Sequence, residues 1–133
     1  MPLIDQLKPH DFEKIIAETY KRLGFRVKIT KRSHDYGVDV FAEKGEDKIC
    51  IQAKLYLKQK VNLKAIQKIY TAKGIYKCNT AVVITNAKFQ KSATISANKL
   101  QVLLIGRKRL LKNLILTVKK LIPKERNPDY KLI

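Results

Sequence analysis

Three polar residues whose types suit phosphodiester hydrolysis lie on two neighbouring segments of this chain. Asp39 belongs to an alternating stretch, and Gln52 and Lys54 belong to the next one, across the turn-like residues 44–47. If the two stretches form an antiparallel hairpin, Asp39 lies directly opposite Gln52, with Lys54 one diagonal step away. Carboxylate and amide oxygens bind hard cations such as Mg²⁺, and an ammonium group can orient water or stabilise charge on a phosphate. The spacing therefore predicts a small hydrolytic site, although an exposed polar strand face would have the same pattern.

The segments around this hairpin predict an α/β fold with a mixed sheet. Residues 8–23 have apolar side chains at helical spacing, whereas residues 25–30, 37–43 and 48–54 alternate as half-buried strands do. The later elements are a helix from Asn62 to about Tyr76, a buried strand over 80–85, a helix over 89–100, a buried strand over 102–105 and a helix over 107–122. A hairpin followed by a β-α-β unit predicts a mixed sheet with helices on both faces. We expect one domain over residues 1–123 and a C-terminal tail over 124–133.

Positive charge is concentrated in the middle of the chain. The 133 residues include 29 Lys and Arg against 11 Asp and Glu, and residues 48–124 contain 18 of the basic residues and none of the acidic ones. Such an excess favours DNA or another polyphosphate as partner, although a Lys-rich solubility surface or an acidic membrane or protein partner would also fit. The expected DNA contacts are Lys31, Arg32, His34, Lys58, Lys60, Lys64, Lys88 and Lys91.

Other sequence features argue against secreted and membrane proteins. No apolar run approaches the roughly 18 residues of a spanning helix, and the first residues lack a basic stretch followed by an apolar one. Cys50 and Cys78 have neither metal-ligand spacing nor the density of a disulfide scaffold. We therefore expect a cytoplasmic protein with reduced thiols and no membrane partner.

Two motifs with the right intervening length resemble a known signature. The motif Asp35-Tyr36-Gly37-Val38-Asp39, followed by Gln52-Ala53-Lys54, is similar to the active-site signature of the Mrr-like restriction endonucleases, in the PD-(D/E)xK nuclease superfamily. Asp11-Phe12-Glu13 and Thr85-Asn86 extend the resemblance, which covers roughly residues 8–115. It implies a restriction-endonuclease-like core and an Mg²⁺-dependent endonuclease, with Mn²⁺ as a substitute ion.

The resemblance also assigns roles to individual residues. It implies metal ligands at Asp39, Gln52, Glu13 and Ala53, a catalytic lysine at Lys54, and a further ligand or supporting acceptor at Asp35. Gln52 stands where most of the superfamily has Asp or Glu, and its amide brings no negative charge. A second carboxylate is therefore needed, and Glu13 is the candidate, although it could equally be a solvated helix residue.

Several functions remain open at this point. The enzyme could be of restriction type or could act on DNA structure, as Holliday-junction resolvases do on a similar core, and ribonuclease activity is not excluded. The alternative is a non-catalytic, basic nucleic-acid-binding protein that retains the nuclease fold. Cleavage of two strands would favour a homodimer by symmetry. Tyr36, Tyr56 and Tyr76 could stack on bases, whereas Tyr70 is predicted to lie in the core.

Overall fold

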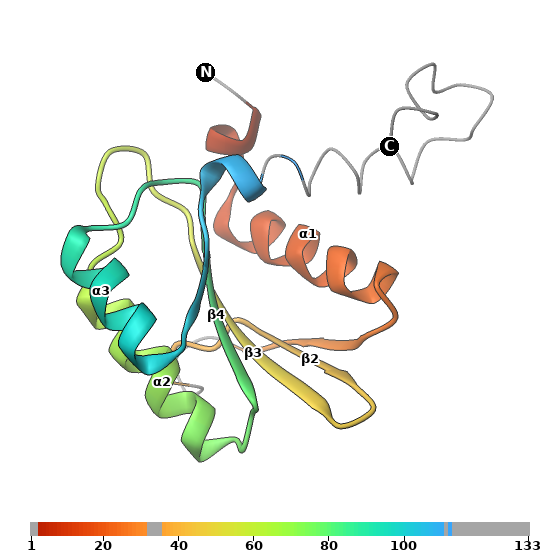
Figure 1. The fold of residues 1–133 in the computed structure, drawn as a ribbon. Coiled ribbons are helices and arrows are strands. Elements are labelled where there is room, and N and C mark those ends of the chain that lie inside the picture. Colours follow the sequence, from red (N-terminus) through yellow and green to blue (C-terminus); the bar gives the residue numbers. More distant parts are fainter. Residues whose placement is uncertain (1–2, 32–35, 111, 113–133) are drawn as a thin grey trace.

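The fold is a five-stranded mixed sheet between two helical layers (Figure 1). The computed structural model describes residues 3–31, 36–110 and 112. Its elements are η1 (Leu3–Gln6), α1 (Pro9–Arg22), β1 (Arg26–Ile29), β2 (Val40–Lys44), β3 (Asp47–Lys54), α2 (Leu63–Ile75), β4 (Thr80–Thr85), α3 (Lys91–Leu100) and β5 (Leu103–Ile105). The strand order is β1-β2-β3-β4-β5, with two antiparallel pairings followed by two parallel ones. The predicted mixed sheet with helices on both faces is confirmed, while the 3-10 helix η1 was not predicted.

The hairpin of β2 and β3 has the predicted register. Val40 pairs with Ile51, and the last pair, Lys44 with Asp47, closes on a turn of two residues rather than four. Gly45 in this turn has φ +60°, a left-handed conformation that glycine adopts without steric cost. The turn is shorter by one residue on each side, so the register is unchanged.

Helix α2 crosses from β3 to the parallel strand β4. The Asn62 side chain caps its start, accepting a hydrogen bond from the Lys64 N–H at 3.0 Å. The helix buries Ile66 and Ile69 against β3 and β4. The prediction that Tyr70 lies in the core is wrong: Tyr70 is 45% exposed, because its neighbour Ile69 occupies the inward position of that helical turn.

The two strands that were predicted to be buried, β4 and β5, differ in how far their side chains are buried. Strand β4 has the predicted bounds and is buried on both faces. The strand predicted over 102–105 is present as β5, but it is only partly buried: Ile105 is buried, whereas Leu103 is 51% exposed. Among the described strands, β5 lies at the edge of the sheet and pairs with β4 alone. The helix expected from residue 107 does begin there, but beyond residue 112 it lies outside the described residues, as does the 124–133 tail.

Helix α1 covers the sheet face opposite to α2 and α3 (Figure 1). Its inward residues Phe12, Ile16 and Ala17 pack with Val40 and Ile51 of the central strands. Complete burial of a side chain such as Phe12 stabilises a fold by about 3 kcal/mol. No helix in the described part of the chain is long and apolar enough to cross a membrane.

Candidate active site

The Asp39 backbone and side chain join three strands just before β2 begins. Its N–H donates to the Ile51 carbonyl at 2.8 Å, and its own carbonyl accepts from the Thr30 N–H at 3.0 Å. Its Oδ2 accepts from the Ala53 N–H of β3 at 2.7 Å. The Asp39 carboxylate thus accepts from a β3 N–H in the way a main-chain carbonyl of a neighbouring strand would. The backbone bonds of Asp39 fix the position of this carboxylate beside β3.

Gln52 is a buried polar residue on the sheet face covered by α2. It is 2% exposed, and it shares its strand face with Cys50, whose Sγ lies 4.0 Å from the Ile69 carbonyl of α2. The chain passes over it at Gly37, where φ is +80° and an added Cβ would lie 2.6 Å from Gln52 Nε2. Among the described residues, Gln52 Oε1 has no hydrogen-bond partner. A buried acceptor without a partner is costly, so this oxygen is suited to receive a ligand.

Lys54 completes the group at the end of β3. It is two residues beyond Gln52, is half-buried, and pairs with Thr85 of β4 in the ladder. Burial raises the pKa of Asp39 above its ordinary value, although the Ala53 N–H and the Lys54 charge act in the opposite direction. The structure therefore brings Asp39, Gln52 and Lys54 together, as the hairpin register predicted.

The donor set fits a hard divalent cation, although it contains little negative charge. In the described part of the chain, no three His, Cys, Asp or Glu residues form a cluster that could hold a metal ion. Asp39 and Gln52 instead offer one carboxylate and one amide oxygen. Mg²⁺ is commonly held by one or two carboxylates, several waters and the phosphates of a substrate. The unpartnered Gln52 oxygen beside Asp39 is compatible with such a site.

The other predicted ligands are placed differently. Glu13 is half-buried on α1, the helix on the sheet face opposite to Gln52, so its role as second carboxylate stays a prediction. Ala53 faces the Asp39 carboxylate through its N–H. Asp35, with the predicted DNA contacts Arg32 and His34, lies outside the described residues.

Three of the expected DNA contacts share one cavity of about 350 Å³ beyond the ends of β3 and β4. Its lining includes Lys58, Lys60 and Lys88 together with Tyr56 and Arg107. The remaining described candidates, Lys31, Lys64 and Lys91, are exposed on a loop and on the first turns of α2 and α3.

Sequence reasoning missed a polar network at the border of this cavity. The buried Asn86 side chain accepts from the Tyr56 N–H at 2.9 Å and donates to the Tyr56 carbonyl at 2.8 Å and to Asp5 Oδ1 at 2.9 Å. Arg107 makes a bidentate pair with Asp5, at 2.7 and 2.9 Å. Because Arg107 and Asn86 both donate to it, the pKa of Asp5 is lowered to about 2. The only signal in the sequence is the Thr85-Asn86 motif, since Asp5 and Arg107 stand far apart along the chain.

Comparison with solved structures shows a shared fold. A crystal structure of a protein of unknown function, AF1548, matches with a TM-score of 0.65 and 19% identity, covering 96% of this chain and 72% of that one. The DNA modification-dependent restriction endonuclease AspBHI matches with a TM-score of 0.64 and 18% identity over 86% of this chain. The MspJI restriction endonuclease, solved with a 27-mer oligonucleotide, matches with a TM-score of 0.59 and 19% identity over 94% of this chain.

This chain spans only about a third of each of the two restriction endonucleases, 33% of AspBHI and 31% of MspJI. No curated protein matches it. The family model of the Mrr_cat restriction endonucleases, however, matches residues 4–114 and so includes the hairpin with Asp39, Gln52 and Lys54. The chain therefore belongs to the Mrr family of restriction endonucleases.

Proposed function

We propose that this protein is a divalent-metal-dependent DNA endonuclease that uses Mg²⁺, with Mn²⁺ as a substitute. The observation that carries the proposal is the buried Gln52 Oε1, which has no hydrogen-bond partner among the described residues and lies on the strand next to the Asp39 carboxylate. A family of restriction endonucleases supplies the reaction class. The site supplies the oxygen ligands and the lysine that this reaction needs.

The proposed roles follow from position. Asp39 and Gln52 would hold the cation, which when bound polarises the scissile phosphate and activates a water molecule. The Ala53 N–H keeps the Asp39 carboxylate oriented. Lys54 lies at the end of the same strand and stabilises negative charge that develops on the phosphate. Glu13 is proposed as the second carboxylate, and Asp35 as a further ligand or supporting acceptor.

The surface beyond the strand ends supports DNA as the substrate. Lys58, Lys60 and Lys88 line a cavity that begins just past the pair of Lys54 and Thr85, so a strand held at Lys54 passes beside them. Lysines of this kind contact phosphates and provide affinity and register without reading the sequence. A homodimer with two such sites could cut both strands of a duplex, one strand at each site.

A cleavage assay tests this proposal directly. The full chain is offered linear duplex, modified duplex, single strand and a four-way junction, each with Mg²⁺, with Mn²⁺ and with EDTA. Lys54→Met should lower the cleavage rate about a hundredfold or more, while DNA affinity changes little. Lys99→Met, which removes an exposed lysine from the end of α3, is the matched control and should cleave as the wild type does.

The substrate that is cut distinguishes the finer alternatives. Metal-dependent cuts confined to the junction would make the protein a resolvase, and cuts in linear or modified duplex would make it a restriction-type enzyme. If every DNA is bound but no cut depends on Asp39, as judged with Asp39→Ala, the nuclease proposal is wrong and the protein is a DNA-binding module.

A further inference from the structure

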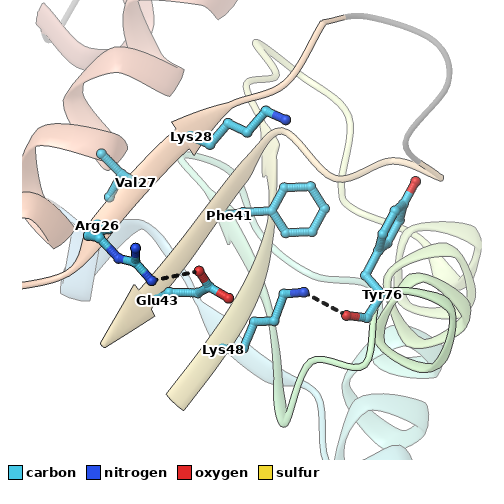
Figure 2. Close-up of a pocket in the computed structure, with 7 residues that line it drawn as sticks. All are labelled: Arg26, Val27, Lys28, Phe41, Glu43, Lys48 and Tyr76. Atoms are coloured by element: carbon cyan, nitrogen blue, oxygen red, sulfur yellow. Dashed lines mark hydrogen bonds and ion pairs between the residues drawn. The ribbon is translucent and has the colours of Figure 1, made fainter. Parts of the chain in front are cut away.

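A second cavity lies on the same sheet face as Gln52, and none of the roles above uses it. We call it the β1–β3 cavity, because three strands form most of its wall (Figure 2). Its volume is about 380 Å³. Its lining includes Arg26 and Lys28 of β1, Phe41 and Glu43 of β2, Lys48 of β3, and Tyr76 directly after α2. A volume of this size lies within the range of about 300–1,000 Å³ typical of small-ligand sites.

The cavity adjoins the Asp39 and Gln52 pair. Phe41 is two residues beyond Asp39 and pairs with Cys50, which is two residues before Gln52, so the side chains follow one strand face. Tyr36 precedes the Gly37 that lies against Gln52. The Tyr36 ring also packs edge-on against Tyr76, with ring centroids 6.4 Å apart. The wall of aromatic rings therefore continues up to the chain segment that crosses Gln52.

Aromatic rings and positive charges occur together here. Phe41 and Tyr76 pack edge to face with centroids 5.1 Å apart, and Figure 2 shows both rings at the cavity. Of the charged groups, Arg26 pairs with the Glu43 carboxylate at 3.3 Å, and Lys48 Nζ donates to the Tyr76 carbonyl at 2.9 Å. Three cations against one carboxylate leave the lining positive.

The combination of aromatic rings and positive charges favours one kind of ligand for the β1–β3 cavity over others. Nucleic-acid-binding proteins hold single-stranded segments with aromatic rings that stack on bases and cations that contact the backbone. An acidic peptide would use the cations but not the rings. A second copy of this chain, with its net charge of +18, would bring like charges together. A base on its phosphate backbone uses both features.

We propose that the β1–β3 cavity binds one unpaired nucleotide of the substrate DNA, with the base against Phe41 and Tyr76 and the backbone near Lys28 and Lys48. This inference rests on the proposed nuclease function and defines its substrate: DNA with an unstacked base close to the scissile phosphate. A base inside a perfect duplex reaches such a cavity only after unstacking, which costs a few kcal/mol. Mismatched, looped and branched DNA should therefore be preferred.

A fluorescent base tests the cavity without any cleavage. The full chain, in EDTA, is titrated into duplexes that carry 2-aminopurine either paired or at one unpaired position, because stacking quenches the emission of this base. Emission from the unpaired probe should fall on binding. Tyr76→Leu should restore the emission and weaken binding to this DNA about tenfold. Tyr70→Leu removes an exposed tyrosine from α2 and should behave as the wild type does.

A surface variant keeps the test decisive if Tyr76→Leu does not fold. Lys28 is exposed, so Lys28→Gln should leave the melting temperature unchanged and weaken binding to the unpaired probe a few-fold, with a shallower dependence on salt. If Lys28→Gln and the folded aromatic variants Tyr76→Leu or Phe41→Leu match the wild type in affinity and emission, the inference is overturned.

Cleavage is measured separately on the paired and unpaired duplexes, so that the two proposals fail in different ways. If both hold, Tyr76→Leu loses the preference for unpaired DNA, about tenfold, and still cuts the paired duplex. A wild type that cuts nothing but quenches the probe through Tyr76 refutes the nuclease and supports the cavity. A wild type that cuts both duplexes equally without quenching refutes the cavity alone.

Discussion

Replacing Asp39 by Asn should abolish cleavage, because it removes the carboxylate proposed to hold the cation. It should do so without loss of stability, because this carboxylate is half-buried and its burial raises its pKa. The Asn Oδ1 can still accept from the Ala53 N–H, so the 2.7 Å hydrogen bond is retained while a partly desolvated charge is removed. One pKa unit corresponds to about 1.4 kcal/mol, and the lost attraction to Lys54 is worth about 0–1 kcal/mol at a partly exposed pair. We therefore expect Asp39→Asn to unfold at the wild-type temperature or a few degrees above it at pH 7.

The matched variant Asp39→Ala leaves the Ala53 N–H without its acceptor, which costs about 1–3 kcal/mol, or several degrees in melting temperature. The pH dependence has a definite sign. A carboxyl whose folded pKa is raised stabilises the fold when protonated, and this contribution is lost as pH rises from about 4 through the folded pKa. Thermal unfolding in EDTA at pH 4 and pH 7 should show the advantage of Asp39→Asn only at pH 7. Equal losses for the Asn and Ala variants at pH 7 would refute this reasoning.

Three further changes, one at Gly37 beside Gln52 and two in the Asn86 network, are each measured by unfolding. Gly37→Ala places a Cβ 2.6 Å from Gln52 Nε2 at φ +80°, so it should cost about 1–3 kcal/mol and reduce cleavage; wild-type stability would contradict this. Asn86→Ala leaves the half-buried Tyr56 N–H without its acceptor and should cost about 1–3 kcal/mol, whereas a loss under about 0.5 kcal/mol would show that water replaces the amide. The low pKa of Asp5, about 2, gives stability that is present above pH 4 and is lost as pH falls towards 2; Asp5→Asn should therefore lose less stability than the wild type over that window, and parallel acid titrations would exclude the effect.

The centre of the site could be predicted because a hairpin leaves few choices. Side chains in a strand alternate with period two, and the turn at Gly45 and Glu46 determines which residues face each other. Asp39 and Gln52 are therefore neighbours once the turn is located. The fact that the turn is two residues long rather than four does not disturb this, since both ends move equally.

Other features depended on contacts that no local pattern contains. Whether an apolar strand such as β5 is buried depends on its place in the sheet, and Leu103 is exposed because nothing pairs beyond it among the described strands. The pair of Asp5 and Arg107 joins segments near the two ends of the described chain. Charged residues at such separations have no periodicity, so only the tertiary structure reveals the network around Asn86.

The donor set of the site connects metal binding to DNA binding. Cation affinity rises with the number of negatively charged ligands, and of the two ligands that the hairpin brings together, Asp39 and Gln52, only Asp39 is charged; even with Glu13 as a second carboxylate, the site would hold few negative charges in a chain of net charge +18. Under the proposed function, a cation therefore meets weak attraction until the DNA phosphate adds anionic oxygens. Coupling of this kind is reciprocal, so the cation raises the affinity for DNA by the same factor as DNA raises the affinity for the cation. Under this proposal, the neutral Gln52 would make the DNA phosphate part of the metal site, so that the cation binds tightly only when a phosphate is in place.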